Sequence, residues 1–167
     1  MPTLQIRITK KPDGSSVFAC TREDGSETWQ RNQTDFFLLH DLNHFALEST
    51  LGLRHGFYGL VAAGWNITDF GERDIAEYAE QEAILAEALA GLFDQERATG
   101  IWPDADGFNE MLGASLASMG HELYRAIKQE ELDTIRTAFV KLVSRWGLLE
   151  SGDHMNLKFI FDIKPTV

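Results

Sequence analysis

The chain is poor in cysteine, and it lacks internal repeats and low-complexity segments. The single cysteine, Cys20, excludes an intrachain disulfide framework and any zinc site built from several cysteines. A lone thiol of this kind is typically a small buried apolar side chain, and we expect this of Cys20. Because no linker-like composition interrupts the sequence, we expect residues 1–167 to form a single domain.

Basic residues are also scarce. Lys and Arg number 15 against 26 Asp and Glu, which gives a formal net charge of −11. This balance argues against nucleic acid as a partner, because phosphate binding requires clustered cations. It equally disfavours anionic membrane surfaces. Cationic ligands, metal ions or basic partners remain compatible with the charge.

Long apolar runs are missing as well. The first residues alternate between apolar and polar types and contain no apolar segment of the kind found in secretory signals. The most apolar window, residues 36–47, is interrupted by His40, Asp41, Asn43 and His44, and it is too short and too polar to span a bilayer. We therefore expect a cytoplasmic protein without a membrane span.

What is present begins with β-structure. Residues 1–33 contain three segments in which apolar and polar residues alternate, over residues 4–9, 16–22 and 27–31. This period of two is typical of half-buried strands, and Asp-Gly turns separate the segments. The pattern predicts a three-stranded β-meander.

Residues 34–150 are predicted to be helical. Thr34 is a suitable N-cap and Gly52 a suitable C-terminal stop for a helix over residues 35–51. On the long helix expected over residues 73–97, Glu87 and Asp94 are predicted to face water. Apolar residues at helical spacing predict the further helices over residues 54–63, 73–97, 107–118 and 129–146, with loops at 65–72 and 100–106.

Residues 154–163 predict a C-terminal strand, in which Leu157, Phe159 and Phe161 alternate with other side chains. An unpaired strand would expose its backbone groups, so we expect this strand to join the N-terminal meander. The expected fold class is α+β: an antiparallel sheet, made of the meander and the C-terminal strand, packed against about five helices.

The helix over residues 35–51 carries the most informative pattern. Four polar side chains, His40, Asp41, His44 and Glu48, fall within an arc of about 100°. Apolar residues cover most of the remaining circumference, which indicates a buried helix. Two histidines at positions i and i+4 can reach one ion from one helix. Zinc, iron, manganese or nickel would suit histidine with carboxylate, so we expect a divalent transition metal as a possible cofactor.

Helix geometry limits how many of these residues can be ligands. His40 and Glu48 are two turns apart, about 12 Å along the axis, so they cannot both bind one ion beside His44. We expect either His40 and His44, or His44 and Glu48, to act with a ligand from another helix. Asp41 or Glu48 would then orient an imidazole from behind.

The additional ligand is expected to come from His121 and Glu122, or from His55. Aromatic residues that follow the stripe in the sequence would wall a pocket around it. These predicted wall residues are Phe57, Tyr58 and Trp65.

The run from Phe36 to Glu48, followed by Gly52 and by residues 56–65, resembles a family of uncharacterised bacterial proteins with an HDLxHFxxE core. The resemblance covers most of the chain and implies an N-terminal β-meander and a C-terminal strand. It brings no established activity with it.

A second similarity is to the ubiquinone-biosynthesis scaffold family, whose zinc-type motif begins HDxxH. His40, Asp41 and His44 match that opening. The glutamate that the family places after eleven further residues is Gly56 here, so the ligand set is incomplete and the function is not transferred.

Two interpretations stay open at this point, and neither specifies an enzymatic reaction. In the first, the protein binds a metal ion through His40, His44 and a carboxylate. In the second, it is a non-enzymatic, homodimeric interaction or assembly module in which the stripe is structural.

Overall fold

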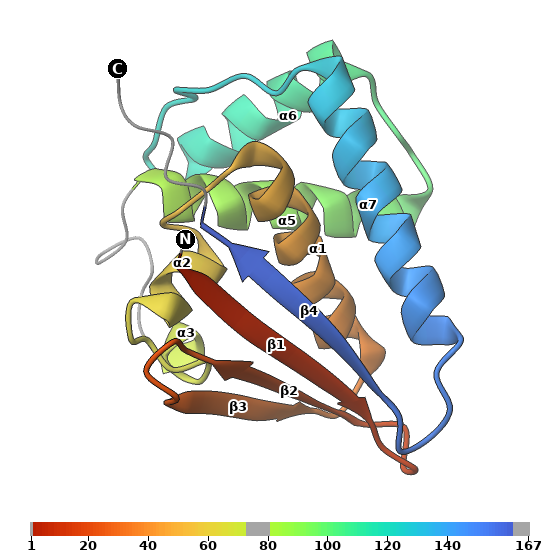
Figure 1. The fold of residues 1–167 in the computed structure, drawn as a ribbon. Helices are drawn as coiled ribbons and strands as arrows, with labels where there is room; N and C mark the ends of the chain where they lie inside the picture. Colours follow the sequence, from red (N-terminus) through yellow and green to blue (C-terminus); the bar gives the residue numbers. More distant parts are fainter. Residues whose placement is uncertain (1, 73–80, 162–167) are drawn as a thin grey trace.

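The computed structural model describes residues 2–72 and 81–161 (Figure 1). Its helices and strands, in chain order, are β1 (Thr3–Lys10), β2 (Ser16–Thr21), β3 (Glu27–Asn32), α1 (Asp35–Leu51), α2 (Phe57–Ala62), α3 (Asp69–Glu72), α5 (Gln81–Thr99), α6 (Ala105–Ser118), α7 (Gln129–Gly147) and β4 (His154–Ile160). The α+β class expected from the sequence is confirmed.

The four strands form one antiparallel sheet in the order β3-β2-β1-β4. β1 pairs on both sides, so that Ile6 lies opposite Cys20 on β2 and opposite Leu157 on β4. Alternate residues of β1, namely Leu4, Ile6 and Ile8, are fully or almost fully buried because they face the helices. The prediction that the C-terminal strand joins the meander is therefore correct.

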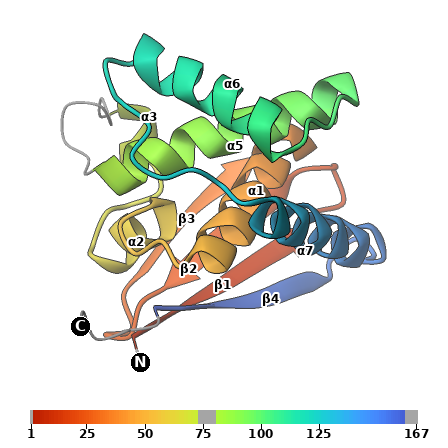
Figure 2. The same cartoon turned by 90° about the horizontal axis from the view of Figure 1, so that it is seen from above.

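The helices of the described residues all lie on one side of the sheet (Figure 2). α1 packs between the sheet and the helices α5 and α7, with which it makes its most extensive helix contacts. It ends at Gly52, whose φ of 66° is the left-handed conformation expected of a helix stop. This central position explains why α1 is apolar nearly all round, and it buries four polar side chains, Asp41, Asn43, His44 and Glu48.

Some element boundaries differ from the predicted ones. Residues 65–72 were expected to form a loop but contain the short helix α3. The segment 54–63 becomes helical only at Phe57, because the backbone N–H groups of Arg54 and His55 donate to the carboxylate of Glu82.

Three further boundaries can be compared. α6 begins at Ala105 because the side chain of Asp104 caps it and accepts from the Gly107 backbone N–H. β4 ends at Ile160, whereas the predicted strand also included Phe161; its last predicted residues, 162–163, lie outside the described residues. The predicted helix 73–97 is described from Gln81 onward, as α5. No described helix is both long enough and apolar enough to cross a membrane.

Candidate metal centre

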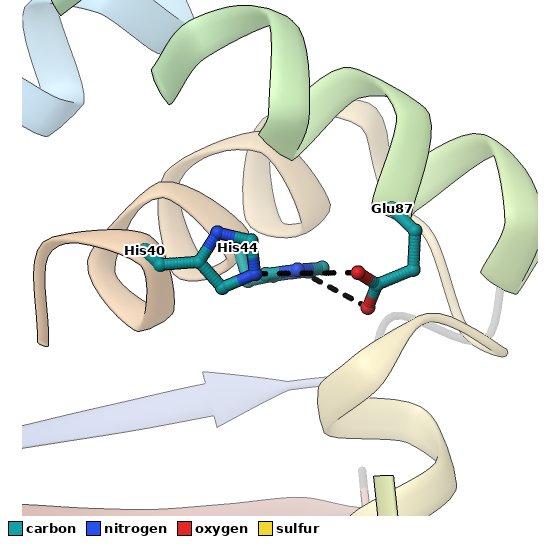
Figure 3. A group of neighbouring side chains, drawn as sticks. All are labelled: His40, His44 and Glu87. Atoms are coloured by element: carbon teal, nitrogen blue, oxygen red, sulfur yellow. Dashed lines mark ion pairs between the residues drawn. The ribbon is translucent and has the colours of Figure 1, made fainter. Parts of the chain in front are cut away.

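Three side chains converge between two helices of the helical layer, α1 and α5 (Figure 3). His40 and His44 extend from α1 and Glu87 extends toward them from α5 (Figure 3). One possible ligand atom of each residue lies within 4.8 Å of the others. This is the only group of three or more potential ligands found among residues 2–72 and 81–161.

His44 is the buried member, with 1% of its surface exposed. Its Nδ1 atom lies 2.9 Å from Oε1 of Glu48, and its Nε2 atom lies 3.3 Å from Oε1 of Glu87. The second contact lacks hydrogen-bond geometry, so Nε2 is a buried polar atom without a hydrogen-bond partner among the described residues. The ring of Phe57 packs beside the imidazole at a centroid distance of 5.6 Å.

Glu48 is completely buried, and other groups already engage both of its oxygens. Besides the contact with His44, Oε1 accepts a hydrogen bond from the backbone N–H of Phe57, and Oε2 accepts one from that of Tyr58. These two N–H groups belong to the first turn of α2, where helix amides lack partners within the helix and favour an anion. Glu48 therefore lies outside the three-residue group and orients His44 from behind.

Gly56 makes this arrangement possible. A Cβ atom at this position would lie 2.5 Å from Cδ of Glu48, closer than real Cβ contacts come. The position at which the ubiquinone-biosynthesis scaffold family would supply a glutamate therefore provides space for the carboxylate of Glu48.

His40, one turn earlier in α1, also has a carboxylate beside each of its two ring nitrogens. Its Nδ1 atom is 2.6 Å from Oδ2 of Asp94, and its Nε2 atom is 4.0 Å from Oε2 of Glu87. The other oxygen of Asp94 accepts from the Asn43 amide at 2.7 Å and contacts Arg97 at 3.3 Å. Asp94 is thus held in place on one side while it orients His40 on the other.

Both imidazoles therefore have a carboxylate on Nδ1 and direct Nε2 toward Glu87. In the tautomer in which Nδ1 carries the proton and donates to the carboxylate, Nε2 presents its lone pair. A lone pair that faces a carboxylate oxygen is repulsive, so either a proton on Nε2 or a metal ion between the two atoms is favoured. A carboxylate behind each histidine is the usual arrangement around protein-bound metal ions.

The electrostatics of the group favour positive charge at this point. Burial of His44 opposes a charge on its ring, but the contacts with Glu48 and Glu87 outweigh burial and raise the pKa of His44 to about 10. Burial acts to raise the pKa of Glu87, yet the contact with His44 prevails and holds that pKa below its ordinary value. The same negative surroundings that retain a proton on His44 would attract a metal ion in its place.

Asp41, expected to orient an imidazole, instead lies next to β3. Its carboxylate accepts a hydrogen bond from the amide of Asn32 at 3.3 Å, and its backbone oxygen accepts from the hydroxyl of Tyr58 at 2.7 Å. Burial raises the pKa of Asp41 to about 7. The described contacts therefore connect Asp41 to the sheet and to α2.

The more distant candidate ligands do not join the group. Nδ1 of His55 lies 3.2 Å from Glu82, and 55% of its side chain is exposed. His121 and Glu122 lie in the segment that follows α6 and are not among the three clustered residues.

Of the three predicted wall residues, one packs against a histidine of the site and two have other ring partners. Phe57 packs against His44 as expected. Tyr58 stacks instead on Phe159 of β4 at 5.1 Å, and Trp65 packs on Phe70 at 5.3 Å.

Glu87 and Asp94 were predicted to face water, and this prediction was wrong for Asp94 and only partly right for Glu87. Their side chains are 32% and 14% exposed, and both face α1. They lie seven residues apart on α5, a spacing that places two side chains on the same face of a helix. That spacing, opposite two histidines one turn apart, is the sequence signal that could have identified them.

Comparison with protein-family models, with curated proteins and with solved structures found no match for this chain. Both family resemblances therefore remain predictions, and the functional argument depends on the geometry of the site.

Proposed function

We propose that this protein holds one divalent transition-metal ion through Nε2 of His40, Nε2 of His44 and the carboxylate of Glu87. The observation that carries the proposal is the paired orientation of the two imidazoles. Each has its Nδ1 atom fixed by a carboxylate, and each directs Nε2 toward the same third side chain.

The spacing of the ligand atoms supports the proposal. Bonds of about 2.0–2.1 Å in a tetrahedral arrangement place ligand atoms roughly 3.4 Å apart. His44 Nε2 and Glu87 Oε1 are 3.3 Å apart, and His40 Nε2 and Glu87 Oε2 are 4.0 Å apart. The three ligand atoms lie within 4.8 Å of one another, so His40 and Glu87, which form the exposed edge of the site, would move inward when an ion binds.

The ligand set also indicates what kind of metal centre this would be. Two histidines and one carboxylate occur in catalytic zinc sites and in non-haem iron(II) sites, both of which retain positions for water or substrate. His40 and Glu87 are 28% and 32% exposed, so solvent can approach the centre from their side. The described residues supply three ligands, whereas a structural site would be closed by a fourth protein ligand, so we infer a metal-dependent enzyme rather than a structural metal site.

Metal analysis tests the proposal. Purified, untagged protein is analysed directly and again after reconstitution with zinc, iron(II), manganese or nickel. We expect one ion per chain in the unaltered protein and its loss in His40→Gln and Glu87→Gln. Matched changes at exposed sites, His154→Gln on β4 and Glu110→Gln on α6, are expected to retain the ion.

Circular dichroism of each variant verifies that it is folded. Failure of every metal to bind, or equal binding by the site variants and the controls, would refute the proposal.

The homodimer expected from the sequence remains a prediction. Sedimentation velocity decides it, because a single species with the mass of one chain would contradict it.

A further inference from the structure

A second feature of the helical layer is an apolar pocket between α1, α5 and α7. Its volume is about 320 Å³. Figure 2 shows α7 and α5 on either side of α1. The apolar part of the wall is formed by Leu39, Phe93, Trp102, Phe139, Val140 and Val143. Trp102 and Val140 are each about half exposed, so the pocket opens to solvent.

The charged side chains of the wall are already balanced. Arg136 donates two hydrogen bonds to the carboxylate of Glu96, at 3.1 and 2.5 Å. Arg97 contacts Asp94 at 3.3 Å through Nη2, while its Nη1 atom is buried without a hydrogen-bond partner among the described residues. Because each arginine is matched by a carboxylate, the wall offers no net charge to a ligand, and the rest of the wall is mainly aromatic and aliphatic.

The polar corner of this pocket adjoins the candidate metal centre. Asn43 and Arg97 line the pocket, and both hold one oxygen of Asp94. The other oxygen of Asp94 lies 2.6 Å from Nδ1 of His40. A molecule packed against Asn43 or Arg97 would therefore affect the position of the Asp94 carboxylate, which orients the proposed metal ligand His40.

We infer that this pocket binds a neutral, largely apolar small molecule, and that this binding is coupled to the metal centre through Asp94. Apolar cavities of about 150 Å³ accept benzene, and ligand pockets begin at about 300 Å³, so the volume fits a molecule of two aromatic rings. It is too small to admit a helix, whose diameter with side chains is about 10–12 Å. Ligand binding in the pocket does not depend on the proposed function, whereas the coupling rests on it.

The neutral, two-ring fluorophore N-phenyl-1-naphthylamine is a suitable probe. Titration into protein kept in EDTA is expected to show saturable binding with one site per chain. Val140→Trp places a large side chain into the pocket and is expected to weaken binding at least tenfold. Lys141→Trp, an exposed change one residue further along α7, is the matched control and is expected to bind normally.

Non-saturable binding, or equal binding by Val140→Trp and Lys141→Trp, would refute the proposal that this pocket binds an apolar small molecule. Circular dichroism verifies that both variants are folded.

The coupling is tested by repeating the zinc titration with the fluorophore at saturation. A packed pocket holds Asn43 and Arg97 against Asp94 and so fixes His40, which is expected to tighten zinc binding about fivefold or more. Unchanged or weaker zinc binding refutes the coupling and leaves the inference of ligand binding in the pocket unaffected. If zinc does not bind, the titration is repeated with iron(II), manganese and nickel. Failure of all four metals to bind overturns the proposed function together with the coupling, and the titration in EDTA still tests ligand binding in the pocket.

Discussion

Replacement of Gly56 by alanine tests whether Glu48 is held as tightly as the structure indicates. The new Cβ would lie 2.5 Å from Cδ, 2.6 Å from Oε2 and 2.7 Å from Oε1 of Glu48. The carboxylate must therefore leave the position in which it contacts His44 and accepts hydrogen bonds from the backbone of Phe57 and Tyr58. Because Glu48 is 0% exposed, water cannot replace these partners.

The size of the effect follows from these contacts. A hydrogen bond to a charged group contributes about 1.5–3 kcal/mol, and a buried donor that is left unpaired costs a similar amount. Loss of one or two of the three contacts of Glu48 lowers the free energy of unfolding by about 2–4 kcal/mol. The same displacement releases Nδ1 of His44, so weaker metal binding is expected alongside the lower stability.

Urea denaturation followed by circular dichroism measures the change, with the slope of the transition compared between variants. Gly113→Ala is the matched control, because it lies within α6 and a Cβ there meets no atom within 4 Å. Alanine inside a helix is favoured over glycine by up to about 1 kcal/mol, so this control should be as stable as the unaltered protein or slightly more so. A stability of Gly56→Ala within about 0.5 kcal/mol of the unaltered protein would refute the reasoning.

Three further outcomes are expected. Burial raises the pKa of the Cys20 thiol, so a thiol reagent at pH 8 should modify it only after urea is added, and rapid labelling of the native protein would contradict its burial. Burial raises the pKa of Asp41 to about 7, so the folded state keeps a proton that the unfolded chain releases near pH 4, and stability falls as the pH rises from about 4 to 7. Asp41→Asn keeps an acceptor for Asn32 and should be more stable than the unaltered protein at pH 8 but not at pH 4, as measured by urea denaturation in EDTA; an equal difference at both pH values would contradict this. Arg136→Met leaves the buried carboxylate of Glu96 unpaired and should lower stability by about 3 kcal/mol or more, a loss that Glu96→Gln in the same chain should partly restore; additive losses would argue against the ion pair.

Local pattern was sufficient for much of the fold. The alternation around Leu4, Ile6 and Ile8 predicted β1, and the stop at Gly52 predicted the end of α1. Such signals depend on residues close together in the chain, and they survive folding because burial favours the same pattern that the sequence displays. The boundary at Phe57 could not be read in this way, since Glu82 on α5 holds the preceding backbone.

The candidate site, too, has some features that the sequence shows and others that depend on tertiary contacts. The spacing of His40 and His44 was visible in the sequence, because two side chains four residues apart share a helix face whatever the helix packs against. The sequence offered Asp41 or Glu48 as the carboxylate that orients an imidazole but could not choose between them, because the choice depends on contacts such as those between Glu48 and the free amides at the start of α2.

From the order of its residues alone, the chain is expected to form an antiparallel sheet with a helical layer and a buried helix that carries two histidines on one stripe. That Glu87 faces these histidines, and that Glu48 and Asp94 orient them, follows from the packing of the helices. A helix sequence specifies which side chains share a face, whereas the partner of that face is set by how α5 packs across α1. A buried polar stripe has to be satisfied by some neighbour, and only the packing of the helices identifies that neighbour.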